Sequence, residues 1–298
     1  MSTSPSPSIL ITGATGTIGS ELARNLAAKG IPFRALVRSL EKAKPLAELP
    51  GAELVVGDFT DGESMTRALD GMDRAFLLTD SSERAETLQT TFVDVARRTG
   101  VQHIVKLSQL AASPDSPVRF LRYHAAVEGK IKESGLAYTF LRPNLFMQGL
   151  LSFRDPIVQQ GQFFATAGDA TISLIDIRDI AAVAAEALTG SGHEGKTYDL
   201  TGPEALTHPQ MAQILSEELR RSIQYVDVPP AAMRQTLLAG RFPEWQADGL
   251  IEDYAHYARG EASAVSSAVQ DITGKPPRNF RDFVRDYRLE LGFRGLKD

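Results

Sequence analysis

The sequence predicts an α/β protein: a doubly wound parallel sheet with a smaller, mostly helical C-terminal lobe. Three observations lead to this prediction. A glycine-rich turn joins an apolar β run to an amphipathic helix near the start of the chain. Short apolar runs then alternate with helix-period segments as far as Arg142, which is typical of a parallel sheet covered on both faces. The chain has 298 residues, enough for such a core and a second lobe.

The first predicted element is an apolar strand at 9–11, followed by Gly13, Gly16 and Gly19. Without side chains, Gly13 and Gly16 let backbone N–H groups approach a pyrophosphate at a helix N-terminus, and Gly19 lets the helix pack closely on the strand. The alternative is a glycine-rich turn that binds no ligand. Under the first interpretation, the residues of the dinucleotide site are Thr12, Gly13, Thr15, Gly16, Thr17, Ile18 and Gly19.

Apolar runs and helix-period segments follow in regular order. The helix at 83–99, for example, carries Leu88, Phe92 and Val95 on one face. Strands are predicted at 33–37, 53–56, 75–78, 103–107, 138–141 and 196–200, an extended segment at 172–175, and helices at 83–99, 123–133, 177–188 and 208–220. The predicted organisation is a disordered tail at 1–8, a dinucleotide-binding core at 9–145, and a lobe at 146–298 that is interleaved with the last core strands.

Composition argues against several classes of function. The formal net charge of −5 and the lack of a basic run argue against nucleic acid or an anionic membrane as a partner. No apolar run approaches the roughly 20 residues that span a bilayer, and residues 1–8 lack the apolar segment of a signal peptide. The chain has no cysteine and its histidines are scattered, so neither a disulfide nor a zinc site is expected. We therefore expect a cytoplasmic protein without a bound metal.

Several motifs follow one another in order between residues 8 and 205. They are Ile-Thr-Gly-Ala-Thr-Gly-Thr-Ile-Gly at 11–19, Ala-Leu-Val-Arg at 35–38, Gly-Asp-Phe at 57–59, Val-Lys-Leu-Ser at 105–108, Ser-Gly-Leu-Ala-Tyr-Thr-Phe-Leu-Arg-Pro-Asn at 134–144, Ile-Asp-Ile-Arg-Asp-Ile-Ala at 175–181 and Tyr-Asp-Leu-Thr-Gly-Pro at 198–203. With these motifs the chain resembles the atypical, NmrA-like branch of the short-chain dehydrogenase/reductase superfamily.

The resemblance implies a Rossmann core that binds NAD(P) across the strand ends, with Pro143 and Asn144 among the cofactor-binding residues, and a C-terminal substrate lobe. The branch is similar both to reductases of quinones and other small molecules and to regulators that bind the dinucleotide without turning it over.

The choice of cofactor is predicted from charge. Dinucleotide folds usually place an acid about 20 residues past the glycines, where it accepts from the ribose 2′-hydroxyl. Here the second strand ends in Arg38 and Ser39, and no acid stands at its end. A guanidinium binds a phosphate through two parallel hydrogen bonds, so these residues favour NADP(H), with NAD(H) possible; the alternative is a solvated loop face. The family pattern further places Asp58 and Phe59 at the adenine, where the alternative is an ordinary turn containing Asp58.

The standard proton relay of the superfamily is incomplete in this chain. A typical member has a serine at the end of the fifth strand and Tyr-x-x-x-Lys on the next helix, where the lysine lowers the pKa of the tyrosine. Ser108 and Tyr123 stand in the first two places, but Val127 stands where the lysine is expected. Lys130 lies too far along the helix to take that place. Tyr123 is therefore either a proton donor or a residue packed at a domain boundary.

A second constellation is His124 with Glu128, one helical turn apart on the same face. The carboxylate could orient the imidazole, and the pair matches the His-x-x-x-Glu that many NmrA-like sequences carry; the alternative for Glu128 is a solvated helix residue. Lys106 is a further candidate, because a lysine in an apolar central strand needs a partner, which cofactor or substrate would supply. The catalytic candidates are therefore Ser108, Tyr123, His124 and Lys106.

Aromatic and methionine side chains follow the sixth strand, whose carboxyl end is where open α/β sheets bind ligands. Such residues could line an apolar slot for a planar quinone, enone or similar ring beside the nicotinamide. The alternative is that they form the core of the C-terminal lobe. The predicted pocket residues are Phe146, Met147, Phe153, Phe163 and Trp245.

The leading prediction is an NADPH-dependent reductase that transfers hydride to a small apolar acceptor such as a quinone, whose product oxygens can take protons from water. One alternative is a ketone or enone reductase that uses Tyr123 as its acid. The other is a non-catalytic regulator that senses NADP(H) and binds a protein partner. A small-molecule acceptor is the expected partner of the reductase, and a protein partner is expected only of the regulator.

Overall fold

The computed structural model describes residues 8–293, so most of the disordered tail predicted at 1–8 lies outside the described residues. Ser8 is bound to Asp73: its N–H donates to Asp73 Oδ2 (2.9 Å) and its carbonyl accepts from the Asp73 N–H (2.9 Å). The chain divides into two compact units. The first comprises Met1–Asp115, Leu121–Arg142 and Ile177–Tyr198, and the second comprises Ser116–Phe120, Pro143–Asp176 and Asp199–Asp298.

Most of a seven-stranded sheet lies in the first unit. Its strands are β1 (Ile9–Ile11), β2 (Phe33–Val37), β3 (Ala52–Val56), β4 (Arg74–Leu77), β5 (His103–Leu107), β6 (Ala137–Pro143) and β9 (Lys196–Leu200). Their order is β3-β2-β1-β4-β5-β6-β9, and the pairs from β3 to β6 are parallel. The order reverses between β1 and β4, the kind of point at which open α/β sheets bind ligands. The predicted doubly wound sheet is thus confirmed.

The strand β9 runs in the same direction as β6. The Gly195 N–H donates to the Tyr138 carbonyl (2.7 Å) near the beginning of both strands. The Asn144 N–H donates to the Leu200 carbonyl (3.0 Å) near their ends. The parallel arrangement therefore extends to this edge of the sheet.

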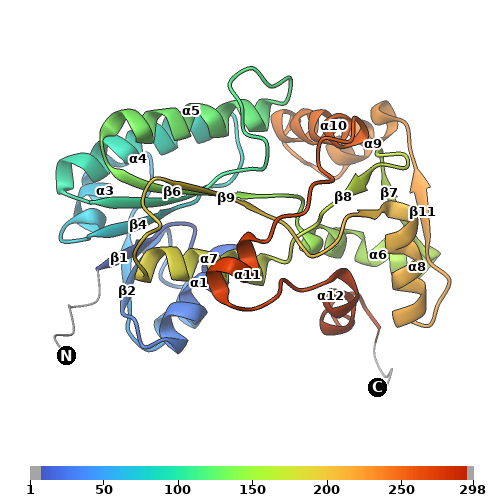
Figure 1. Cartoon of the computed structure of the whole chain (residues 1–298), viewed down its shortest axis with the longest axis horizontal. Coiled ribbons are helices and arrows are strands. Elements are labelled where there is room, and N and C mark those ends of the chain that lie inside the picture. The colour runs from blue at the N-terminus through green and yellow to red at the C-terminus, as the bar shows by residue number, and fades with distance from the viewer. Residues whose placement is uncertain (1–7, 294–298) are drawn as a thin grey trace. The chain divides into compact units, whose positions relative to one another are not determined.

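Helices cover both faces of the sheet, as the alternation of apolar runs predicted. The helices of the first unit are α1 (Thr17–Ala28), α2 (Lys44–Ala47), α3 (Gly62–Leu69), α4 (Ala85–Thr99), most of α5 (Arg119–Ser134) and α7 (Ile177–Thr189). The helices α3, α4 and α5 lie on one face, and α1 and α7 lie on the other (Figure 1). Within residues 8–293, no helix is both long enough and apolar enough to cross a membrane.

Burial on both faces explains why the central strands are mostly apolar. All three residues of β1, Ile9, Leu10 and Ile11, are at most 1% exposed. On one face α1 packs against α7 and buries Leu22 and Leu26 completely. Burying side chains of this size contributes roughly 1.5–3 kcal/mol each. This packing fixes where the strands end, and so where the loops after them meet.

Hydrogen bonds at the helix N-termini explain two of the differences from the predicted helices, at α5 and α3. The helix α5 begins at Arg119, earlier than predicted, because Glu252 Oε2 accepts from the Arg119 N–H (2.7 Å) and so satisfies a donor of the helix N-terminus. The helix α3 is absent from the predicted elements. Asp61 caps it, with Oδ1 accepting from the N–H groups of Glu63 and Ser64 (3.0 and 3.3 Å). An aspartate before a short amphipathic segment is the sequence signal for this helix.

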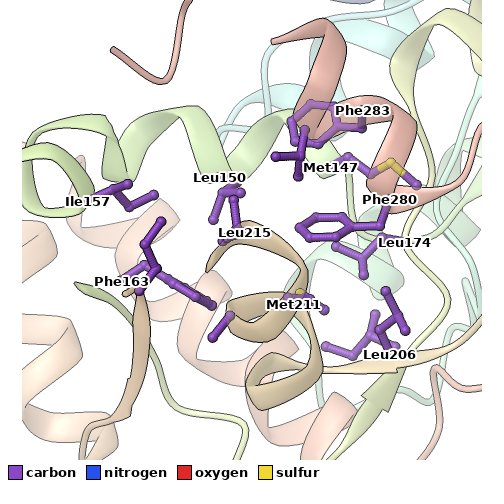
Figure 2. Close-up of a cluster of buried hydrophobic side chains, with 14 of the residues drawn as sticks. Met147, Leu150, Ile157, Phe163, Leu174, Leu206, Met211, Leu215, Phe280 and Phe283 are labelled. Atoms are coloured by element: carbon purple, nitrogen blue, oxygen red, sulfur yellow. The ribbon is translucent and has the colours of Figure 1, made fainter. Parts of the chain in front are cut away.

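The second unit holds the remaining helices and two small sheets, so the predicted mostly helical lobe is confirmed. Its elements are η1 (Met147–Phe153), α6 (Arg154–Gln160), β7 (Gln162–Ala165), β8 (Thr171–Ile172), β10 (Leu206–Thr207), α8 (His208–Glu218), β11 (Gln224–Asp227), α9 (Pro230–Ala239), α10 (Glu244–Ala258), α11 (Ala268–Thr273) and α12 (Phe280–Asp286). The strand β7 is parallel to β11, and β8 is antiparallel to β10. Apolar side chains from η1, β7, α8 and α12 meet in its core (Figure 2).

Candidate cofactor and catalytic site

The glycine turn between β1 and α1 is tightly packed, and its tip is exposed. Gly13 has φ +63°, a conformation that favours glycine, and its carbonyl accepts from the Gly16 N–H (3.0 Å). A Cβ at Gly19 would lie 2.2 Å from the Gly13 carbonyl oxygen, so this packing requires glycine there. Thr15, Gly16 and Thr17 are exposed, and no side chain from the described residues caps α1 at Gly16. The open backbone donors of this helix N-terminus fit a phosphate group.

Thr12 joins the glycine turn to the neighbouring strand. Its hydroxyl lies within donating distance of the carbonyls of Phe76 (2.9 Å) and Leu78 (3.0 Å), and it accepts from the Leu78 N–H (2.9 Å). Thr12 is fully buried and Ile18 is 3% exposed. These two residues therefore pack on the buried side of the turn. The exposed residues of the turn are the ones that a dinucleotide could contact.

The ends of β2 and β3 bring Arg38 and Asp58 to the same edge of the sheet. The pairing of the two strands extends to the residues just before Arg38 and Asp58, since the Gly57 N–H donates to the Val37 carbonyl (3.1 Å). Arg38 follows β2 directly and is exposed, with Ser39 half-buried beside it. An exposed guanidinium at the end of the second strand suits a 2′-phosphate.

Asp58 and Phe59 form a turn where the chain leaves β3. Asp58 Oδ1 accepts from the backbone N–H and the hydroxyl of Thr60 (2.8 and 2.6 Å). These hydrogen bonds lower the pKa of Asp58, and the nearby Arg38 guanidinium lowers it further. Phe59 stacks on Phe92 of α4, with ring centroids 5.4 Å apart. The geometry is that of an Asp-containing turn, and the adenine contact of Asp58 and Phe59 stays a prediction.

Pro143 and Asn144, which the resemblance places at the cofactor, belong to the second unit and are buried. The Asn144 amide nitrogen donates to Ser173 Oγ (2.9 Å) and to the Ala262 carbonyl (2.8 Å), and its Oδ1 accepts from the Leu145 N–H (2.8 Å). The side chain thus ties together three segments of the second unit. A cofactor contact of these two residues stays a prediction.

Lys106 and His124 form a buried pair in the first unit. Lys106, from β5, is fully buried, and His124, from α5, is 8% exposed. Lys106 Nζ lies 2.7 Å from His124 Nδ1 and donates to the Leu107 carbonyl (3.0 Å). Burial lowers the pKa of Lys106 to about 7. Burial, and after it the charge of Lys106, lowers the pKa of His124 well below its usual range. Lys106 therefore has His124 as its partner within the mostly apolar strand β5.

Ser108 and Glu128, which are buried, and Arg142, which is half-buried, form a second cluster beside this pair. Nε and Nη2 of Arg142 donate to the two carboxylate oxygens of Glu128 (2.9 and 2.5 Å), and Ser108 Oγ donates to Glu128 Oε1 (2.6 Å). Ser108 and Arg142 are neighbours because the Ser108 N–H donates to the Leu141 carbonyl (2.7 Å). Glu128 is 3% exposed, so it is not a solvated helix residue. It binds Ser108 and Arg142, while Lys106 faces Nδ1 of His124.

Tyr123 is nearly buried, and its ring centroid lies 4.1 Å from that of His124. Its hydroxyl is 2.9 Å from Ser81 Oγ in the loop after β4, and either atom could donate. Val127, at the place of the superfamily lysine, is fully buried in an apolar cluster. Lys130 forms an ion pair with Asp94 of α4 (2.7 Å). The structure therefore gives Tyr123 a serine as a hydrogen-bond partner where the superfamily pattern has a lysine.

Most of the predicted pocket residues lie in the core of the second unit (Figure 2). Met147 and Phe163 are 1% and 2% exposed, and Phe153 packs against the same cluster, 6.3 Å from Phe163 between ring centroids. These three residues therefore form part of the core of the lobe, which is the alternative to an acceptor pocket. Phe146 and Trp245 are half-buried and stay proposed acceptor contacts.

Arg142 and Ser81 belong to this arrangement but are missing from the predicted site. Arg142 follows an apolar run within the motif at 134–144, and a charge at the end of a buried strand signals a partner of opposite charge. No comparable signal exists for Ser81, because its contact with Tyr123 depends on the path of the loop after β4.

A doubly wound sheet with a tight glycine turn and an open helix N-terminus beside its switch point defines a dinucleotide-binding class of α/β protein. The comparison with protein families agrees with this class. The chain belongs to the NmrA-like family, whose model matches residues 5–276. The family resemblance of the sequence motifs is therefore confirmed.

Individual relatives align with almost the whole chain. An NAD(P)H azoreductase of Xenophilus azovorans is 36% identical over 284 residues, covering 95% of this chain and 99% of the relative. A (4-alkanoyl-5-oxo-2,5-dihydrofuran-3-yl)methyl phosphate reductase of Streptomyces griseus is 37% identical over 280 residues, covering 94% and 97%. Among solved structures, the NADPH complex of quinone oxidoreductase QOR2 of Escherichia coli has a TM-score of 0.86 and 28% identity, covering 94% and 99%.

Proposed function

We propose that the chain is an NADPH-dependent reductase that transfers hydride to a small apolar acceptor such as a quinone. The observation that carries the proposal is the glycine turn, with Gly13 at positive φ, no room for a Cβ at Gly19, and an uncapped helix N-terminus. Similar proteins include an NAD(P)H azoreductase and a quinone oxidoreductase bound to NADPH. These similar proteins support the enzyme class predicted from the sequence, an NAD(P)H-dependent oxidoreductase, independently of the geometry of the site.

In this proposal the exposed backbone of residues 15–17 holds the pyrophosphate. Arg38, with Ser39 beside it, binds the 2′-phosphate that distinguishes NADPH from NADH. Asp58 and Phe59 border the adenine. When bound, the dinucleotide supplies a hydride from its nicotinamide ring, and the protein supplies binding and orientation.

The hydrogen bond of Ser108 favours a quinone over a ketone as acceptor. A ketone becomes an alkoxide on hydride transfer, and the superfamily relay stabilises it with donors from serine and tyrosine. Here the single hydroxyl proton of Ser108 goes to the Glu128 carboxylate (2.6 Å), so Ser108 cannot also donate to a carbonyl. A reduced quinone oxygen is a much weaker base than an alkoxide and depends less on such a donor.

NADPH oxidation with a panel of quinones and ketones of similar size tests the proposal. We expect kcat/KM for quinones to exceed that for ketones on the order of tenfold or more, because only the ketone needs the missing donor. Turnover confined to ketones and lost in Tyr123→Phe would overturn the quinone assignment. Tight NADPH binding without oxidation by any acceptor would overturn the reductase assignment in favour of a regulator that binds a protein.

A further inference from the structure

The buried pair of Lys106 and His124 lies where β5 ends, at the carboxyl edge of the sheet. Ligands of open α/β sheets bind at this edge. Resting on the proposed function, we propose that His124 delivers the proton that the reduced acceptor requires, from Nε2, and that Lys106 is the positioning residue that replaces this proton through Nδ1.

While Lys106 is protonated, its contact with His124 determines which ring nitrogen of His124 carries the proton. Lys106 Nζ faces Nδ1 at 2.7 Å, and its second bond goes to the Leu107 carbonyl (3.0 Å). A lysine ammonium has three donors and no acceptor, so Nδ1 must be the unprotonated nitrogen of a neutral ring. The ring proton is then on Nε2, the ring nitrogen that does not face Lys106.

Two of the other candidate acids are already engaged. Ser108 donates to Glu128, and both oxygens of Glu128 are bound by Arg142. The Tyr123 hydroxyl is hydrogen-bonded with Ser81 (2.9 Å), and Val127 stands where the superfamily pattern has its lysine. His124 is then the candidate acid that remains. Its proton source, Lys106, lies at hydrogen-bond distance from it.

The surrounding charges keep this proton source active near neutrality. Burial lowers the pKa of Lys106 to about 7, the Glu128 carboxylate opposes this shift, and the Arg142 guanidinium adds to it. His124 is faced by Lys106 and Arg142, which hold it neutral together with burial. A lysine with a pKa near 7 can give up its proton at physiological pH, which an exposed lysine cannot do efficiently.

The proposed step balances for a quinone. The acceptor takes a hydride from the dinucleotide and a proton from His124 Nε2, and it becomes a hydroquinone while NADPH becomes NADP⁺. As the Nε2–H bond breaks, Nδ1 takes a proton from the Lys106 ammonium, which becomes a neutral amine. The pair is restored when Nε2 takes a proton from water and Nδ1 returns its own to Lys106.

The pH dependence of kcat with a quinone tests the assignment. We expect the wild type to have a level profile below about pH 7 and a falling one above it, as Lys106 loses its proton. Lys106→Met, which keeps an unbranched side chain but removes the amine, should lower kcat on the order of tenfold or more and remove the break near neutrality. As a control, Lys130→Met removes the lysine of α5 that pairs with Asp94, and this variant should keep the wild-type profile. A wild-type profile in Lys106→Met would overturn the proposal.

An acceptor that needs no proton separates chemistry from structural damage. A triarylmethyl cation takes up hydride at carbon, so its reduction does not involve a proton donor. His124→Asn keeps an acceptor toward Lys106 but removes Nε2–H. We expect it to lower the quinone rate on the order of tenfold or more and to change the rate with the cation by less than about twofold. Equal losses with both acceptors would mean a structural role for His124.

NMR of the unliganded protein tests the pair without turnover. The His124 ring should be neutral with its proton on Nε2, and the Lys106 ε-methylene should titrate near pH 7. A proton on Nδ1, or a Lys106 titration at the pH of an exposed lysine, would overturn this inference even if the protein is a reductase. Failure of every acceptor with NADPH would instead overturn the proposed function.

Discussion

Gly19 has no room for one further carbon atom, since a Cβ there would lie 2.2 Å from the Gly13 carbonyl oxygen and 2.8 Å from Ala14 Cα. Gly19→Ala must displace α1 from the turn, and we expect it to weaken NADPH and NADH alike, on the order of tenfold or more, and to cost roughly 1–3 kcal/mol of unfolding free energy. Calorimetric titration and urea unfolding measure both effects.

Gly129→Ala in α5 is the matched control, because nothing lies within 4 Å of the position of its Cβ. Alanine is the better helix former, so this variant should gain about 0.5–1 kcal/mol and bind both dinucleotides as the wild type does. If Gly19→Ala binds with wild-type affinity, the turn is not the pyrophosphate site.

Glu128 is a buried carboxylate whose two oxygens bind the guanidinium of Arg142. Glu128→Gln removes this charge at nearly the same shape, and we expect a loss of roughly 2–4 kcal/mol in unfolding free energy, because one member of a buried ion pair is lost. Asp94→Asn, at the exposed pair with Lys130, should change stability by less than about 0.5 kcal/mol. Similar values for the two variants, measured by urea unfolding, would contradict the buried pair.

Among the elements, α3 depends on a single cap. Asp61 accepts from two backbone N–H groups at its start, so Asp61→Ala should cost about 1 kcal/mol, whereas Asp61→Asn, which can also cap, should cost clearly less. Thermal unfolding of the two variants measures the difference. Equal losses would show that charge, and not the cap, stabilises α3.

Elements set by local sequence could be predicted, and elements set by remote pairing could not. The β1 turn was predicted because its glycines and the following helix period are contiguous in the chain. The strand β7 was not predicted, because Phe163 pairs with Tyr225 of β11, far along the chain. Phe163 is predicted as a pocket residue because it is an aromatic residue that follows the sixth strand, but its side chain is buried in the core of the second unit.

The same distinction holds for the candidate site: local sequence predicts some of its features, and contacts between remote segments determine the others. The types of residue in the predicted catalytic set follow from motif and spacing, but their partners do not. The contact of Lys106 with His124 depends on how α5 lies along β5, and that of Glu128 with Arg142 depends on how the same helix lies along β6. Neither arrangement can be read from one strand or helix alone.

For the whole molecule, buried histidines make stability depend on pH. Burial lowers the pKa of His103 and His208 to about 4 and that of His124 well below 6.5. Unfolding exposes rings that bind protons below pH 6.5, so the unfolded state holds more protons than the folded state as pH falls toward 4. Each histidine should therefore remove up to about 1.4 kcal/mol of stability per pH unit in this window.

His208→Phe tests this expectation for one ring. His208 is 4% exposed, its Nδ1 is buried without a hydrogen-bond partner among the described residues, and its ring stacks on Tyr225. Phenylalanine can keep the stacking but cannot take up a proton. The variant should lose less stability than the wild type between pH 6.5 and 4.5, measured by urea unfolding. Parallel pH profiles would show that His208 is accessible to protons in the folded state.

The central claim is that this chain binds NADPH through the glycine turn and through Arg38, and calorimetric titration with NADPH and NADH tests it most directly. We expect the wild type to prefer NADPH, and Arg38→Ala to weaken NADPH on the order of tenfold or more, because a charge-assisted phosphate contact contributes roughly 1.5–3 kcal/mol. NADH, which lacks the 2′-phosphate, should bind Arg38→Ala as it binds the wild type, and Lys42→Ala in the same loop should change neither affinity. Equal losses of NADPH and NADH in Arg38→Ala, or no binding of either dinucleotide by the wild type, would contradict the account.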